Sequence, residues 1–260
     1  MTNLPWVVSR EWLAANRDEV RLVDVRDAWE YDGIGHIPDA VSIPFDEYRS
    51  DGDEDEGKLP GVETWNRLMS EAGIEPEDTL VAYDDTHGVF AARFVVTALN
   101  YGHDDVHLMD GDYSAWNREH ETTNAAPEVE PTEYEATIPD DRPLISAEAV
   151  LDALDEPDTV ILDTREDWEY EEGHIPGAQV LDWRDLVDEE SRGVKSEAEL
   201  RTLLESMGVT PEKRVILYCN TARRISHTYV VLRHLGYDHV DFYEGSLTEW
   251  EKIDGPVETA

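Results

Sequence analysis

One short run of residues occurs twice in this chain, in slightly different form. Residues 22–26 read Leu-Val-Asp-Val-Arg, and residues 161–165 read Ile-Leu-Asp-Thr-Arg. Further pairs follow in the same order: 35–40 (GHIPDA) with 173–178 (GHIPGA), 80–84 with 216–219, 102–106 with 236–240, and Gly111 and Trp116 with Gly245 and Trp250. The offset between the copies falls only from 139 to 134 along the chain. Order and spacing kept in this way indicate a tandem duplication of a domain of about 120 residues.

Chain length and the composition between the copies predict the domain boundaries. The chain has 260 residues, which suits two small domains. Residues 125–142 hold three prolines and many glutamates without a sustained period, which is typical of a linker. We therefore expect a first domain over residues 1–124 and a second over residues 143–260. Residues 46–58, which hold seven acids, predict an exposed loop.

Strand and helix patterns alternate in the second copy. Short apolar runs predict strands at residues 159–162, 214–218 and 239–242. Capping serines and apolar spacing predict helices at residues 146–154, 196–207 and 224–235, and a short helix from Leu247. This alternation predicts α/β domains, each with a mostly parallel sheet flanked by helices. The ligand site of such a sheet lies beyond the carboxyl ends of its strands, which directs attention to the residue after Tyr218.

That residue is Cys219, the only cysteine of the chain. A short loop, Asn220-Thr221-Ala222-Arg223-Arg224, connects it to the next predicted helix. Such a loop can turn successive backbone N–H groups toward one point, and the helix N-terminus adds positive potential there. These features favour the thiolate, which is the nucleophilic form of cysteine. We therefore interpret Cys219 as a nucleophile rather than as a small buried apolar residue.

Composition excludes several other classes of protein. One cysteine rules out an internal disulfide framework and a multi-cysteine metal site. Nine histidines without closely spaced partners give no ligand set, so we expect neither a metal nor another cofactor. The formal charge of −40 argues against nucleic-acid binding and against an anionic membrane surface. The start of the chain carries no targeting signal and no apolar run is long enough to span a membrane, so we expect a cytoplasmic protein.

The charge also carries information about the solvent. The basic residues are 17 Arg and only 4 Lys, against 61 acidic residues. Acidic excess with few lysines is typical of halophilic proteins, and here it suggests a haloarchaeal source. At 1 M salt the Debye length is about 3 Å, so most of the self-repulsion would be screened. An ordinary acidic protein is the alternative.

The tandem copies, the GHIPGA motif, the cysteine loop and the closing Glu244-Gly245…Trp250 together resemble the rhodanese family. The resemblance covers nearly the whole chain and is closest to two-domain thiosulfate and 3-mercaptopyruvate sulfurtransferases. It implies two tandem rhodanese-like domains and a covalent mechanism. The Cys219 thiolate would take the outer sulfur of a small anionic donor and pass it to cyanide, to a thiol or to an acceptor protein.

The resemblance also implies roles for particular residues. Backbone amides from Asn220, Thr221, Ala222, Arg223 and Arg224 would hold the persulfide and the leaving anion, and the two arginines would bind a sulfonate-like group. Arg165 aligns with a family position that reaches the donor; its alternative is an ion pair with Asp163 or Glu166. The family usually has glycine where this chain has Ala222, which leaves the donor open. The paired arginines favour thiosulfate over mercaptopyruvate.

The first copy lacks the nucleophile, because Asp84 stands where Cys219 stands in the second. A carboxylate cannot carry a transferable sulfur, and inside an amide nest it would fill the anion site itself. We therefore expect the first domain to be non-catalytic. His36 and His174 lie within Gly-His-Ile-Pro turns, where we expect each ring to tie its loop to neighbouring residues.

Three other functions fit parts of the pattern. Cysteine-dependent phosphatases and arsenate reductases use a loop of cysteine, five residues and arginine, whereas here Ile225 is the sixth residue after Cys219. A persulfide relay to a dedicated acceptor, as in thiolation or cofactor assembly, would use the same chemistry at Cys219. A purely structural role would require an inert thiol.

Overall fold

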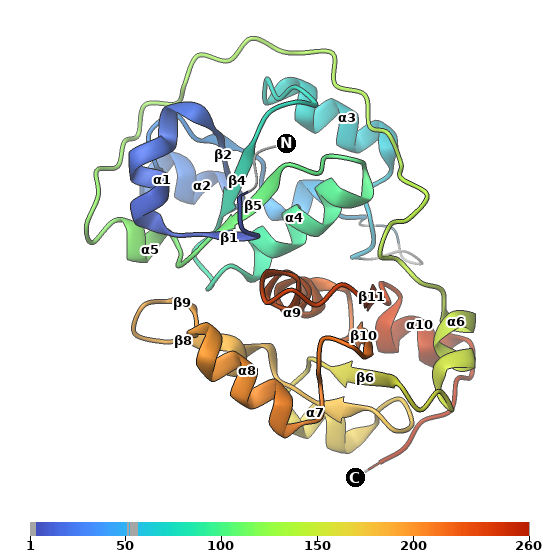
Figure 1. Ribbon diagram of the computed structural model, residues 1–260. Helices are drawn as coiled ribbons and strands as arrows, with labels where there is room; N and C mark the ends of the chain where they lie inside the picture. The colour runs from blue at the N-terminus through green and yellow to red at the C-terminus, as the bar shows by residue number, and fades with distance from the viewer. Residues whose placement is uncertain (1–3, 51, 53–56, 260) are drawn as a thin grey trace. The chain divides into compact units, whose positions relative to one another are not determined.

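The computed structural model describes residues 4–50, 52 and 57–259. The chain divides into two compact units: the first comprises Met1–Arg142 and Asp188–Val194, and the second Pro143–Val187 and Lys195–Ala260. Each unit has a sheet of parallel strands with helices on both faces, as Figure 1 shows. The predicted fold class is therefore confirmed.

The sheet of the first unit has five strands in the order β1-β5-β4-β2-β3. The strands are β1 (Val7–Val8), β2 (Arg21–Asp24), β3 (Val41–Ser42), β4 (Leu80–Tyr83) and β5 (Val106–Met109). The helices are α1 (Arg10–Asn16), α2 (Ala28–Gly33), α3 (Val62–Glu71), α4 (Val89–Asn100) and α5 (Tyr113–Trp116), with 3-10 turns η1 (Arg17–Glu19) and η2 (Phe45–Tyr48). All of the pairings that connect these strands are parallel.

Alternation along the strands supplies the two faces of this sheet. Leu22, Val81 and Tyr83 belong to a buried cluster that also holds Leu13 of α1 and Trp116 of α5. The opposite face is covered by α4, which packs against β4 and β5. Burial on both faces explains why these strands are almost continuously apolar.

Two segments of the first unit can be compared with the sequence predictions: the exposed loop at residues 46–58 and the linker at residues 125–142. In the acidic stretch 46–58, residues 51 and 53–56 lie outside the described residues. Tyr48 is fully buried in η2 and donates to the Phe90 carbonyl at 2.8 Å, so the expectation of an exposed loop is wrong there. Apolar packing of this ring against Phe94 of α4 outweighs the polar composition around it. Residues 125–142 form neither helix nor strand, and Tyr134 is buried beside His103.

The sheet of the second unit has four strands in the order β11-β10-β6-β7. They are β6 (Thr159–Asp163), β7 (Gln179–Val180), β10 (Arg214–Tyr218) and β11 (Val240–Phe242). The helices are α6 (Ala147–Ala153), α7 (Asp167–Glu172), α8 (Glu197–Ser206), α9 (Arg223–His234) and α10 (Ser246–Lys252), with a 3-10 turn η3 (Trp183–Leu186). The helices and strands predicted for this half from sequence are confirmed. Ser146 and Ser196 cap α6 and α8 as expected.

The two faces of this sheet are again buried. Ile161, Ile216 and Tyr218 pack in a cluster with Val150 of α6 and Trp250 of α10. The other face carries α9, which contacts β10, β11 and η3. The strand β10 therefore lies inside the sheet, between β6 and β11, with its carboxyl end at Tyr218.

Strands β8 (Val187–Asp188) and β9 (Gly193–Val194) pair as a separate two-stranded ribbon. The part of this ribbon that groups with the first unit carries Arg192, whose Nε lies 2.8 Å from both carboxylate oxygens of Asp112. The Asp112 side chain is fully buried, so this ion pair anchors the ribbon. Within the described residues, no helix is both long and apolar enough to cross a membrane.

Candidate active site

Cys219 directly follows β10 and precedes α9, at the carboxyl end of the parallel sheet. It is a free cysteine, and 1% of its surface is exposed. Its backbone is held by the start of α10: the Cys219 N–H donates to Ser246 Oγ at 3.1 Å, and its carbonyl accepts the Leu247 N–H at 2.9 Å. The Ser246 hydroxyl also lies 4.0 Å from the thiol sulfur. The predicted position of the cysteine at a strand end is thus observed.

The loop after Cys219 turns through a left-handed residue. Ala222 has φ 62° and ψ −2°, caps the N-terminus of α9, and is fully buried. Because the φ of this position is positive, a non-glycine residue there costs about 1 kcal/mol of backbone strain. The first N–H groups of α9 have no acceptor within the helix, and this helix starts four residues after Cys219. The loop therefore offers backbone donors and helix-dipole potential near the thiol.

The side chains at the two ends of this loop meet one carboxylate. Asn220 Nδ2 donates to Glu169 Oε1 at 2.7 Å, and both terminal nitrogens of Arg224 donate to the Glu169 carboxylate. Although burial opposes the effect, the hydrogen bonds from Arg224 and the Glu166 amide hold the pKa of the Glu169 carboxyl below its ordinary value. Arg223, by contrast, is the first residue of α9 and is half-buried.

Arg165 lies in a buried ion pair with Asp163. Its Nε donates to Asp163 Oδ1 at 2.9 Å, and its Nη2 donates to the Gly173 carbonyl at 2.6 Å. Arg26 of the first unit makes the same contacts, at 2.9 Å to Asp24 and 2.7 Å to the Gly35 carbonyl. Because the copy without a cysteine keeps these contacts, they support the structural alternative for Arg165 over a contact with the donor.

The two histidines of the Gly-His-Ile-Pro turns also pack locally. His36 stacks on Tyr31 with ring centroids 3.7 Å apart, and His174 stacks on Tyr170 at the same distance. Each ring Nδ1 lies within hydrogen-bond distance of the carbonyl of the tyrosine on which it stacks. These contacts agree with the expected role of tying the turn to its neighbours.

In the first unit, Asp84 fills the loop that corresponds to the cysteine loop. Its Oδ1 accepts the Thr86 and Gly88 N–H groups, and its Oδ2 accepts those of Phe90 and Ala91, all at 2.8–3.1 Å. The carboxylate is fully buried. Burial raises the pKa of this carboxyl, and the four amides oppose the rise. As the sequence argument expects, the side chain itself occupies the anion site of this copy.

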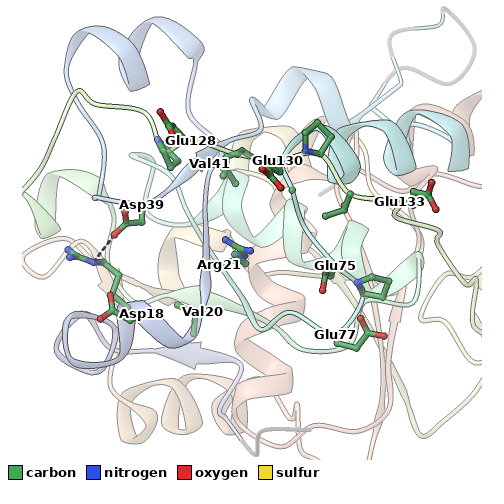
Figure 2. Close-up of a pocket in the computed structure, with 17 residues that line it drawn as sticks. Asp18, Val20, Arg21, Asp39, Val41, Glu75, Glu77, Glu128, Glu130 and Glu133 are labelled. Atoms are coloured by element: carbon green, nitrogen blue, oxygen red, sulfur yellow. Dashed lines mark ion pairs between the residues drawn. The ribbon is translucent and has the colours of Figure 1, made fainter.

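A cavity of about 1160 Å³ lies in the first unit, among residues that do not include the cysteine loop (Figure 2). Residues 127–133 form one of its walls, and the segments around Arg21 and Glu75 form others. Its lining holds seven carboxylates and two arginines. A negatively charged wall of this kind suits an anionic sulfur donor poorly, so we place the candidate active site at Cys219.

Sequence reasoning missed two residues of this site. Ser246 was not distinguishable from other serines, because its contact with Cys219 spans 27 residues of chain. Glu169 lies in helix α7, which the sequence analysis did not predict. A signal was available: Glu166 and Glu169 form a capping box, as Asp27 and Glu30 do at the matching place in the first copy.

Comparisons with known proteins agree with this geometry. The family model described as "Rhodanese-like domain" matches residues 9–119 and residues 146–253. The thiosulfate sulfurtransferase of Pseudomonas aeruginosa is 32% identical over 271 residues, which cover 99% of this chain and 98% of that protein. The sulfur carrier protein TtuD of Thermus thermophilus is 33% identical over 273 residues, with 96% and 94% covered.

A solved structure shows the same architecture. The crystal structure of SseA from Escherichia coli, reported for the rhodanese fold and catalytic mechanism of 3-mercaptopyruvate sulfotransferases, has a TM-score of 0.83 to this chain. It is 26% identical, and the match covers 94% of this chain and 99% of SseA. Relatives of this chain therefore include proteins named for two different sulfur donors and one named as a carrier.

Proposed function

Since the chain belongs to the rhodanese family and carries two rhodanese-like domains, we propose that this rhodanese-type sulfurtransferase takes sulfur from thiosulfate and holds it as a persulfide on Cys219. The observation that carries the proposal is the contrast between the copies. A thiol follows the strand in the second unit, and a carboxylate bound by four loop amides follows it in the first.

The reaction has two steps. The Cys219 thiolate attacks the outer sulfur of thiosulfate, the sulfur–sulfur bond of the donor breaks, and sulfite leaves with the bonding electron pair. The product is a Cys219 persulfide. Cyanide or a thiolate then attacks the outer sulfur, and the Cys219 thiolate is regenerated as thiocyanate or a new persulfide leaves. No net oxidation of the enzyme occurs.

The loop supplies the positive potential that an anionic donor needs. Donor groups of the loop backbone, the N-terminus of α9 and Arg223 and Arg224 act together there. Glu169 offsets one of the two arginine charges, so the balance of the three side chains stays positive. This balance supports thiosulfate as the donor; 3-mercaptopyruvate is the alternative that the likeness to SseA brings forward. The cytoplasm, which the sequence favours, suits a thiol that must stay reduced between turnovers.

A second candidate function is a persulfide relay. The 33% identity to a protein named as a sulfur carrier favours it. In this version Cys219 is loaded in the same way, and a partner protein takes the sulfur in place of cyanide or a small thiol. The two versions differ in the acceptor alone.

The test is sulfur transfer to cyanide in molar salt, with thiosulfate or 3-mercaptopyruvate as donor, for the wild type and Cys219→Ser. We expect thiocyanate from thiosulfate, a mass increase of one sulfur atom on the wild type, and neither for Cys219→Ser.

Full activity in Cys219→Ser would overturn the mechanism. A strong preference for mercaptopyruvate would overturn the donor, and aryl phosphate hydrolysis without sulfur transfer would favour the phosphatase alternative. A mixed disulfide trapped between Cys219 and a partner protein would favour the relay.

A further inference from the structure

Glu169 connects both ends of the cysteine loop to helix α7. Its Oε1 accepts Asn220 Nδ2 at 2.7 Å and Arg224 Nη2 at 3.3 Å, and its Oε2 accepts Arg224 Nη1 and, at 3.1 Å, the Glu166 N–H. The side chains of Glu169 and Arg224 are 8% and 19% exposed, so the pair is largely shielded from water. Hydrogen bonds to a shielded charge are among the stronger ones in proteins.

The first copy provides an internal comparison. Glu30 occupies the same place in α2 and makes the same capping contact, with its Oε2 3.1 Å from the Asp27 N–H. Asp85 follows Asp84 where Asn220 follows Cys219, and helix α4 begins with Val89 and Phe90 where α9 begins with two arginines. The side chains of Asp85, Val89 and Phe90 cannot donate a hydrogen bond to a carboxylate. The bridge across the loop therefore accompanies the cysteine and is not a requirement of the fold.

The bridge fixes a charge near the reacting sulfur. Burial opposes the effect, but the hydrogen bonds that Arg224 donates to Glu169 raise the pKa of the guanidinium, and the charge of Cys219 adds to the rise. Arg224 lies in the first turn of α9, five residues after Cys219, and shares the Glu169 carboxylate with Asn220, the residue that directly follows Cys219. An unrestrained arginine at the start of a helix samples several rotamers, and holding it in one lowers the entropy cost of binding an anion.

We propose that Glu169 is a positioning residue for sulfur transfer, which holds Arg224 and Asn220 so that the loop presents its positive charge to Cys219 and to the incoming anionic donor. This inference rests on the proposed function, in which the Cys219 sulfur receives the outer sulfur of the donor. It makes a prediction opposite in sign to that of simple charge cancellation. If Glu169 only neutralised Arg224, its removal would release a positive charge and speed the attack on an anion.

The experiment compares Glu169→Gln with Glu30→Gln, the matched change in the first copy. Glutamine keeps the length of the glutamate side chain. It carries no negative charge, so it can no longer form an ion pair with Arg224. We expect Glu169→Gln to lower kcat/KM for thiosulfate about tenfold, which is about 1.4 kcal/mol, mainly through a higher KM for the donor. The rate at which cyanide removes sulfur from a preformed Cys219 persulfide should change little. Glu30→Gln should leave both half-reactions as in the wild type.

Arg224→Gln and the double variant complete a cycle. We expect Arg224→Gln to lower kcat/KM for the donor. The double variant should have nearly the same kcat/KM as Arg224→Gln alone, because a positioning residue acts through the group it positions. An increased or unchanged donor rate in Glu169→Gln, or full additivity in the double variant, would overturn the inference. If Glu169→Gln does not fold, unchanged donor kinetics in Arg224→Gln would overturn it on its own.

The proposed function and this inference fail in different ways. Activity that survives Cys219→Ser removes the proposed function. Activity that depends on Cys219 but is indifferent to Glu169 removes only the positioning role. If mercaptopyruvate is the better donor, the wild type and the same four variants are compared with that donor, and the same outcomes apply.

Discussion

Asp84 and Cys219 each directly follow the tyrosine that ends an inner parallel strand, and the Asp84 carboxylate accepts four backbone amides of the loop after it. The tyrosines themselves play one role in both copies. Tyr83 and Tyr218 each accept a backbone N–H from the Gly-His-Ile-Pro turn, at 3.1 Å in both cases. The scaffold is thus conserved between the copies, while the residue at the strand end is not.

The first prediction concerns the amides around Asp84. Asp84→Ala removes their acceptor, and a buried N–H without a partner costs about 1–3 kcal/mol. Four amides lose their acceptor, and two of them belong to the buried residues Gly88 and Ala91, so we expect the free energy of unfolding to fall by about 3 kcal/mol, measured by denaturant titration in molar salt. Cys219→Ala, the matched truncation in the second unit, should cost much less. Equal losses in the two variants would contradict the assigned role of the Asp84 carboxylate.

The second prediction concerns the left-handed residue of the cysteine loop. Ala222→Gly relieves the strain of φ 62°, and we expect the free energy of unfolding to rise by up to about 1 kcal/mol. The greater entropy that glycine gives the unfolded chain reduces this gain. Sulfur transfer should stay close to that of the wild type. Ala198→Gly, in a right-handed helical position of α8, should have the opposite sign, with a loss of about 1 kcal/mol. A loss of stability in Ala222→Gly would show that strain at this residue is not the dominant effect.

A third prediction separates structure from catalysis at Arg165. Removing one partner of a buried ion pair costs about 3–5 kcal/mol. Lysine keeps the charge but loses the forked geometry, so we expect Arg26→Lys and Arg165→Lys to lower stability by similar, smaller amounts. The KM for thiosulfate of the folded enzyme should change little in both. A large rise of KM in Arg165→Lys alone would instead favour contact between Arg165 and the donor.

The fourth prediction concerns salt. With a formal charge of −40, repulsion among surface acids is felt over about 10 Å at 0.1 M salt but only about 3 Å at 1 M. We expect tryptophan fluorescence and circular dichroism to report loss of the fold as salt is lowered, with sulfur transfer lost in parallel. Full stability and activity in dilute buffer would contradict a halophilic origin.

Much of the fold could be predicted because its signals are local. Strands β6, β10 and β11 are short apolar runs, α6 and α8 begin at capping serines, and a strand end followed by a helix start locates Cys219 without tertiary information. Tyr48 shows the limit of such reasoning. It lies in an acidic stretch, and its burial depends on α4, whose residues Phe90 and Phe94 are more than forty positions away.

Residue type and spacing along the chain are enough to establish the duplication, the α/β class, the place of the single cysteine and the replacement of its counterpart by Asp84. The side chains that surround the loop depend instead on tertiary contacts. Glu169 reaches Asn220 and Arg224 across 51 and 55 residues, and it can do so because β6 lies beside β10 in parallel register, with Asp163 opposite Tyr218. That register brings the start of α7 to the carboxyl end of β10. A pattern that fixes each strand separately does not specify which neighbour the strand will pair with, so no local signal could have connected this carboxylate to the cysteine loop.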